Sequence, residues 1–174
     1  SITTTIIFGG GIVGLNINLS LHEAGKGGET YLLEKEPFFG HHTSTRNSEV
    51  VHAGIAYPPD SLKARLCVEG NRLTKELADR FEIPIHKKGK WILATNEAEA
   101  VGLEKLAVNA RESGAVPLEP RGPQEAVDDV PELKLPVAAM YAPSTAMIDC
   151  ASYVRALDRY LSHEGVALIK PCTV

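Results

Sequence analysis

A glycine-rich turn between a strand and a helix is the feature that most constrains this chain. Residues 9–14 read Gly-Gly-Gly-Ile-Val-Gly and match the pattern Gly-x-Gly-x-x-Gly. A β-branched run at 4–8 precedes them, and apolar residues at helical spacing follow over 12–24. A second apolar run at 30–33 ends at Glu34. This order predicts a strand–helix–strand unit, which places the chain in the α/β class with a Rossmann-like start.

The glycines and the acid at the end of the second strand have separate roles in dinucleotide binding. Gly9 permits the tight turn, Gly11 lets a pyrophosphate approach the backbone, and Gly14 lets the helix and strand pack closely. The free N–H groups at the helix start favour a phosphate. Glu34, which stands 20 residues after Gly14, can accept hydrogen bonds from an adenosine ribose. The unit therefore predicts a dinucleotide site, with a glycine turn that binds no nucleotide as the alternative.

The chain after Glu34 does not continue a simple double winding. An NAD-binding domain would add a third parallel strand after one more helix. A polar loop, a long helix and hairpin-like strands follow instead, which favours a flavin-binding fold. The expected elements are a helix from Asp60 or Ser61 with a stripe of Leu62, Leu66, Leu73 and Leu77, two strands around 87–90, a helix from Asn96 to about 113, a strand at 137–141, a helix from Asp149 and a strand at 166–169.

The loop over 41–57 is dense in hydrogen-bond donors. Its Ser and Thr hydroxyls, the Asn47 amide and the Arg46 guanidinium suit a pyrophosphate and the edge of a flavin. A solvated loop with a cap at Asn47 or Ser48 is the alternative interpretation.

Several strings along the chain are more specific than the glycine turn. They are the glycine turn with Glu34-Lys35, Arg46-Asn-Ser-Glu-Val-Val-His-Ala-Gly-Ile55, Ser61-Leu-Lys-Ala-Arg-Leu-Cys-Val-Glu-Gly-Asn71, Gly89-Lys-Trp-Ile-Leu-Ala-Thr95 and Tyr141-Ala-Pro-Ser-Thr145. On these strings the chain resembles the N-terminal part of the FAD-dependent L-2-hydroxyglutarate dehydrogenases and oxidases, in the D-amino-acid-oxidase-like superfamily. The resemblance covers essentially the whole chain. Members of that family are considerably longer, so we expect an N-terminal portion.

The resemblance implies FAD as the cofactor and assigns its contacts. Gly9, Gly11, Ile12, Val13 and Gly14 would line the pyrophosphate, Glu34 and Lys35 would face the adenosine, Thr43, Ser44, Thr45, Arg46, Asn47 and Ser48 would lie beside the flavin, and the backbone of Val174 would touch the adenine. It also implies oxidation of L-2-hydroxyglutarate, or a related 2-hydroxy acid, to the 2-oxo acid by hydride transfer to the flavin. His52 is the candidate base, because a neutral histidine can accept a proton near pH 7.

Two departures from the family pattern bear on this interpretation. Asn18 stands where a small residue usually follows the glycine turn, so helix–strand packing is expected to be less ideal. Ala56-Tyr57 stands where the family tends to have two tyrosines, which makes the substrate less defined than the cofactor. An amine or amino-acid oxidase of the same superfamily, and a non-catalytic FAD- or NAD-binding scaffold, therefore stay as alternatives.

We expect an incomplete FAD-binding domain over 1–82 and 146–174, and the first part of an inserted β-rich substrate domain over 83–145. His41, His42 and His52 could suggest a metal. Adjacent histidines in a loop rarely converge, however, and no cysteine or acid cluster joins them, so no metal site is expected.

Charge and composition limit the partners. A net charge of −4 argues against nucleic acid as a partner. The chain contains no apolar run of the roughly 18 residues that span a bilayer and no leader, so we expect a cytoplasmic protein, or one peripheral to a membrane. Its 3 cysteines predict no disulfide framework. The expected partner is a small 2-hydroxy acid, and the electron acceptor, oxygen or quinone, stays open.

Overall fold

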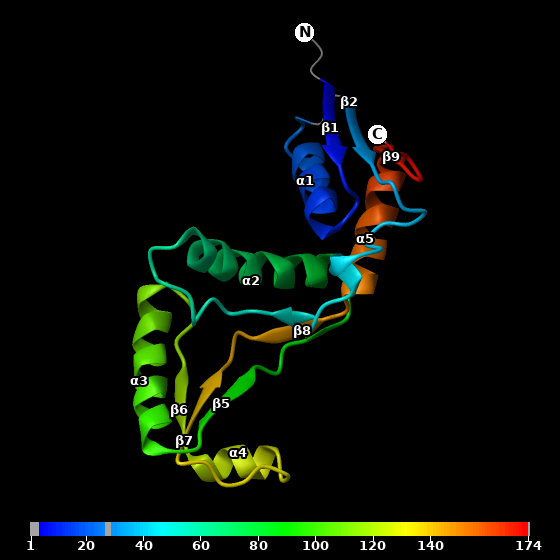
Figure 1. Ribbon diagram of the computed structural model, residues 1–174. Coiled ribbons are helices and arrows are strands. Elements are labelled where there is room, and N and C mark those ends of the chain that lie inside the picture. Colours follow the sequence, from blue (N-terminus) through cyan, green and yellow to red (C-terminus); the bar gives the residue numbers. More distant parts are fainter. Residues whose placement is uncertain (1–3, 27–28, 174) are drawn as a thin grey trace. The chain divides into compact units, whose positions relative to one another are not determined.

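The computed structural model describes residues 4–26 and 29–173, and the chain forms two compact units (Figure 1). The first unit comprises residues 1–49, 81–84 and 149–174, and the second comprises residues 50–80 and 85–148. The expected domain boundary at residue 82 assigned 50–80 to the first part, whereas these residues pack within the second unit. The functional division into an FAD-binding domain and a substrate domain stays a prediction.

The first unit contains a parallel sheet in the order β1-β2-β9. Its strands are β1 (Thr4–Phe8), β2 (Glu29–Leu33) and β9 (Ala167–Ile169). Helix α1 (Ile12–Glu23) connects β1 to β2, and α5 (Cys150–His163) precedes β9. The predicted strand–helix–strand start and the Rossmann-like α/β class are therefore confirmed.

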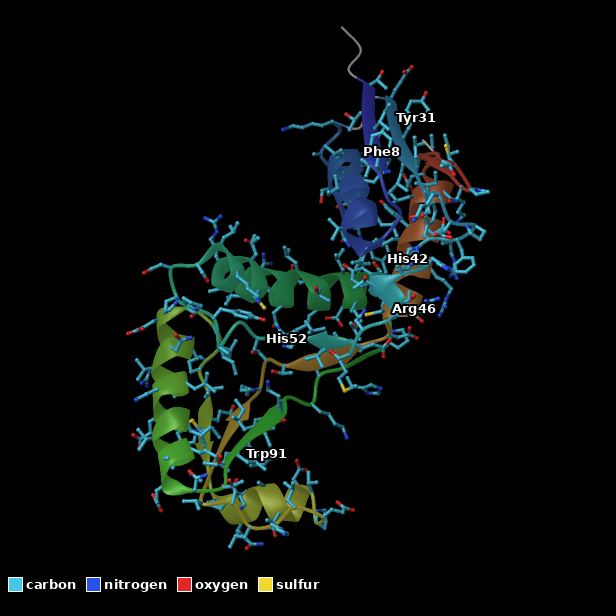
Figure 2. The ribbon with its side chains drawn as sticks, viewed as in Figure 1. Phe8, Tyr31, His42, Arg46, His52 and Trp91 are labelled. Carbon is cyan, nitrogen blue, oxygen red and sulfur yellow. The ribbon has the colours of Figure 1, made fainter. Side chains whose placement is uncertain are left out.

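One face of this sheet carries the core of the first unit. Side chains alternate between the two faces of a strand, so Ile7 and Leu32 lie on the covered face and are buried, while Ile6 and Phe8 are exposed (Phe8 is labelled in Figure 2). Helices α1 and α5 pack against each other. They contribute the fully buried or nearly fully buried side chains Leu15, Leu19, Leu157 and Leu161.

The second unit contains two antiparallel sheets and three helices. The first sheet is β3 (Val50–Val51), β8 (Ala146–Ile148) and β4 (Ile85–His86), and the second is β5 (Lys90–Ala94), β7 (Ala138–Ala142) and β6 (Glu119–Arg121). The helices are α2 (Leu62–Arg80), α3 (Glu97–Glu112) and α4 (Pro123–Asp129).

The two strands around 87–90 exist as expected but do not form a hairpin. β4 pairs with β8, and β5 pairs with β7. The chain passes from one sheet to the other at Gly89, which has a φ of +66° and donates its N–H to the Thr145 carbonyl at 3.0 Å.

Helix α2 buries a different stripe from the one that its leucines indicate. Leu62, Leu66 and Leu73 are 61%, 55% and 41% exposed, whereas Ala64 and Asn71 are buried. Small side chains on the buried face allow close approach to neighbouring backbone. Asn71 uses this proximity, since its Nδ2 lies 3.3, 3.1 and 2.9 Å from the carbonyl oxygens of Val51, His52 and Ser144.

The predicted helix starts are confirmed by their capping bonds. The side chains of Ser61, Asn96 and Asp149 accept the N–H groups of Ala64, Glu99 and Ser152 at 3.1, 3.0 and 2.7 Å. Such caps satisfy N–H groups that have no partner within the helix.

No helix in the described ranges is long and apolar enough to cross a membrane. The three cysteines are free thiols, as expected.

Candidate cofactor site

The glycine turn joins β1 to α1 with the geometry that its sequence predicts. Gly9 has a φ of +98°, which favours glycine. A Cβ on Gly14 would lie 2.0 Å from the Gly9 carbonyl oxygen, so only glycine lets the helix approach the turn this closely. Gly9 and Gly14 thus have the structural roles expected of them, while the binding of a pyrophosphate to this turn stays a prediction.

The carboxylate of Glu34 closes the turn from the end of β2. It is buried, at 8% exposure, and its Oε2 accepts the N–H of Gly10 at 2.7 Å. Its Oε1 accepts the N–H of Glu36 at 2.9 Å. A carboxylate offers about four acceptor sites, so these two bonds leave acceptor capacity for the hydroxyls of a ribose.

The N-cap residue of α1 is Gly11, which has no side chain that could cap the helix. The N–H of Ile12 instead donates to Ser44 Oγ at 2.9 Å, from the short helix η1 (Thr43–Thr45). A Cβ on Gly11 would lie 3.0 Å from the same oxygen. Because a hydroxyl that accepts one hydrogen bond still has its own proton, Ser44 adds a donor beside the positive end of the helix.

Side-chain bonds within the loop hold its backbone in place. Thr45 Oγ1 donates to the Gly40 carbonyl at 2.7 Å. Asn47 Nδ2 donates to the carbonyls of Thr43 and Ser44 at 3.0 and 3.1 Å, and Asn47 Oδ1 accepts the N–H of Glu49 at 2.7 Å. The contacts of Asn47 therefore match the alternative interpretation, a cap within the loop, and its contact with a flavin stays a prediction.

The remaining predicted residues fall into three groups. Side chains that are exposed, and so available to a ligand, are Val13, Lys35, Thr43, Arg46 and Ser48. His52 belongs to the second unit, where its side chain is exposed and its carbonyl accepts from Asn71. Val174 lies outside the described residues.

One residue of the turn, Gly10, was given no role from the sequence, and its neighbour Phe39 was expected to pack under the loop. Gly10 is buried against Phe39, and a Cβ on Gly10 would lie 2.0 Å from Phe39 Cδ1 and 3.1 Å from Glu34 Cβ. Phe39 is itself only 5% exposed. The signal for this contact was the third adjacent glycine, which the Gly-x-Gly-x-x-Gly pattern leaves free to vary.

The loop also brings Glu36 to the paired histidines. Glu36 Oε1 lies 2.9 Å from His42 Nε2, and the hydrogen bond with His42 is the main cause that lowers the pKa of Glu36. Glu36, His41 and His42 each place one possible metal-ligand atom within 4.8 Å of the others. The adjacent histidines were expected not to converge and to have no cysteine or acid cluster beside them, whereas Glu36 and both imidazoles lie together in this loop. The expectation of no metal site rested on that premise.

The donors and acceptors of the first unit fit a dinucleotide. The N–H groups at the start of α1 and the Ser44 hydroxyl suit a pyrophosphate, and the Glu34 carboxylate suits a ribose. A Cβ on Gly10, Gly11 or Gly14 would meet Phe39, Ser44 or the Gly9 carbonyl, so contacts within the protein require glycine at these positions.

Known proteins with similar sequences are L-2-hydroxyglutarate dehydrogenases. The mitochondrial enzyme of Arabidopsis thaliana is 40% identical over 156 residues, which is 88% of this chain and 31% of that protein. The enzyme of Escherichia coli strain O17:K52:H18 is 38% identical over 119 residues, which is 62% of this chain and 28% of that protein. The chain thus spans about a third of the length of these relatives.

Solved structures with the same fold include two oxidases, one of which has FAD bound. Glycine oxidase from Geobacillus kaustophilus matches with a TM-score of 0.80 and 25% identity, over 96% of this chain and 46% of that one. L-α-glycerophosphate oxidase from Mycoplasma pneumoniae with FAD bound matches with a TM-score of 0.81 and 24% identity, over 96% of this chain and 44% of that one.

The expected cytoplasmic location is wrong on these findings. The relatives from Arabidopsis thaliana, Caenorhabditis briggsae, Caenorhabditis elegans and Dictyostelium discoideum are all named as mitochondrial proteins. The expectation rested on a missing leader, and a sequence that spans about a third of its relatives gives no information about one.

The family comparison agrees with the geometry of the glycine turn. The model of the family described as FAD dependent oxidoreductase matches residues 4–174, which includes the turn, Glu34, the loop and the second unit. The chain therefore belongs to the FAD-dependent oxidoreductase family.

Proposed function

We propose that this chain is part of an enzyme that oxidises L-2-hydroxyglutarate, or a related 2-hydroxy acid, to the 2-oxo acid. The observation that carries the substrate is the match to the Arabidopsis thaliana L-2-hydroxyglutarate dehydrogenase over 88% of this chain. The bond of Glu34 to the glycine turn supports the cofactor, because it holds the carboxylate beside the turn, where a ribose and a pyrophosphate would bind.

Bound FAD supplies the two-electron oxidation, which amino-acid side chains cannot perform. In this proposal the first unit holds the adenosine and pyrophosphate through the glycine turn, Glu34 and Ser44. The second unit begins the substrate domain and contributes His52. A ring nitrogen of His52 would accept the proton that the substrate hydroxyl loses. The exposure of the His52 side chain supports this role, since a base must reach the proton that it removes.

A substrate panel on the full-length protein tests the proposed function. The purified protein is kept free of oxygen, and its visible flavin absorbance is followed after addition of L-2-hydroxyglutarate, D-2-hydroxyglutarate, glycine, L-proline or glycerol 3-phosphate. We expect bleaching by L-2-hydroxyglutarate and little by its enantiomer. Re-addition of oxygen, or of a soluble quinone, then identifies the electron acceptor.

The second candidate is an amine or amino-acid oxidase of the same superfamily. It is favoured by the fold likeness to glycine oxidase from Geobacillus kaustophilus, at 25% identity. Bleaching by glycine or L-proline, and none by L-2-hydroxyglutarate, would select this candidate. A flavin that none of the five compounds bleaches would instead favour a binding scaffold without catalysis.

A further inference from the structure

The loop that follows β2 gathers a carboxylate and two imidazoles at one place. Glu36 and His41 are partly buried, and His42 is exposed (Figure 2 labels His42). One possible ligand atom from each side chain lies within 4.8 Å of the other two. The closest pair is Glu36 Oε1 and His42 Nε2, which are 2.9 Å apart.

One of these groups has an unmet hydrogen-bonding need. The Nδ1 atom of His41 is shielded from solvent and has no hydrogen-bond partner among the described residues. The ring is held by aromatic contacts, with centroids 4.6 Å from Phe38 and 4.9 Å from His42. Buried polar atoms are normally paired. An ion bound at His41 Nδ1 would give this atom the partner that it lacks.

The backbone around the cluster is fixed at both ends. The N–H of Glu36 is bonded to Glu34 Oε1 at 2.9 Å, and the N–H of Gly40 is bonded to the Gly10 carbonyl at 2.9 Å. Gly40 has a φ of +71° and packs against Val154, so a larger residue would not fit there. These contacts hold the backbone that carries the three side chains. This lowers the entropic cost of gathering the side chains around an ion.

We propose that Glu36, His41 and His42 bind a divalent transition-metal ion, with Zn²⁺ as the probe. Two imidazoles and one carboxylate form a ligand set that Zn²⁺ accepts, with a fourth position left for water. Ligand atoms at zinc distances in a tetrahedron stand about 3.4 Å apart. On binding of the ion, the proton shared by Glu36 Oε1 and His42 Nε2 would be released to solvent, and the 2.9 Å separation would lengthen slightly. The His41 imidazole would move inward by side-chain rotation.

One neighbouring charge opposes the ion. Lys35 Nζ lies 3.8 Å from Glu36 Oε1, but the Lys35 side chain is 65% exposed. A long, exposed lysine can turn into solvent at small cost, because surface ion pairs contribute little to stability.

Calorimetric titration with Zn²⁺ tests the site in the full-length protein after dialysis against a chelator. Parent protein is compared with His42→Gln and Glu36→Gln, and with His86→Gln as the matched control, because His86 is exposed on β4 in the second unit. Loss of an outer partner of a metal ligand already costs about 10- to 100-fold in affinity. We expect each ligand variant to bind zinc at least 10-fold more weakly than the parent, or to lose one zinc site. We expect His86→Gln to bind zinc as the parent does.

Zinc-edge X-ray absorption of the parent adds a direct readout, in which two imidazole ligands are expected. His42 is exposed, so His42→Gln should keep the fold, and circular dichroism checks this. A parent that binds no zinc, or two ligand variants that bind zinc as the parent does, would overturn the proposal. Zinc binding is measured without substrate or turnover, so this outcome is independent of the substrate assignment.

Discussion

The carboxylate of Glu34 accepts the backbone N–H of Gly10 at 2.7 Å, across 24 residues of sequence. This bond locks the end of β2 to the glycine turn, and it places a buried negative charge beside the start of α1. The same carboxylate holds the N–H of Glu36, so it organises the turn and the following loop together.

Glu34→Gln is expected to weaken FAD binding in the full-length protein. The amide cannot accept on both sides, and hydrogen bonds to charged groups contribute about 1.5–3 kcal/mol each. That range corresponds to about a 10- to 150-fold rise in the dissociation constant for FAD. Fluorescence quenching of FAD on the apoprotein measures the constant, with Glu29→Gln on the exposed start of β2 as the control. An unchanged constant for Glu34→Gln would remove Glu34 from the ribose site.

Gly14→Ala is expected to destabilise the first unit. Its Cβ would lie 2.0 Å from the Gly9 carbonyl oxygen, and that oxygen belongs to a constrained turn that cannot move aside freely. Overpacking of this kind costs about 1–3 kcal/mol. Gly102→Ala in α3 is the matched control, because nothing lies within 4 Å of its Cβ. Urea unfolding should show a gain of up to about 1 kcal/mol for Gly102→Ala, and equal effects of the two variants would contradict the predicted close packing.

The buried asparagines Asn18 and Asn71 are expected to respond differently to alanine substitution. Asn71 Nδ2 lies within hydrogen-bond distance of three backbone carbonyls, so Asn71→Ala removes a buried donor from all three and should cost about 1–3 kcal/mol, although the Ser144 carbonyl keeps Lys75 as a donor. Asn18 is fully buried, and neither side-chain polar atom has a partner in the described structure. Asn18→Ala should therefore leave the free energy of unfolding unchanged or raise it. A loss of stability in Asn18→Ala as large as that in Asn71→Ala would show that the Asn18 amide is paired.

The first 34 residues could be predicted because several local signals agree there. A β-branched run, three glycines, a helical period and a terminal acid all fall within one short segment, and the two strands pair through a single crossover. The caps at Asn96 and Asp149 were predictable for the same reason, since each bond spans three residues.

The other features depend on contacts that the local sequence does not encode. The pairing of β4 with β8 joins residues more than 60 positions apart, so the neighbouring strand β5 looked like the natural partner. The leucines of α2 form an apolar stripe, but the buried face was decided by the small Ala64 and by Asn71 fitting against backbone carbonyls. In the candidate site, the Ser44–Ile12 bond spans 32 residues, and the approach of Glu36 to His42 depends on the path of the loop.

His52→Ala is expected to retain FAD and to slow flavin reduction by about 10²- to 10⁴-fold, the usual contribution of a general base. Stopped-flow absorbance with excess L-2-hydroxyglutarate under anaerobic conditions measures the rate. His86→Ala serves as the control, because His86 is also exposed within the second unit. A reduction rate for His52→Ala within a few-fold of the parent would place the base on another residue.

The most direct test of the proposed function is the stoichiometry of one anaerobic turnover. Full-length protein with bound FAD is mixed with a small excess of L-2-hydroxyglutarate, and flavin absorbance and 2-oxoglutarate are measured in the same sample. We expect one molecule of 2-oxoglutarate for each flavin reduced, with slower reduction when deuterium replaces hydrogen at C2 of the substrate. A flavin that stays oxidised, or that is reduced without formation of 2-oxoglutarate, would contradict the proposed function.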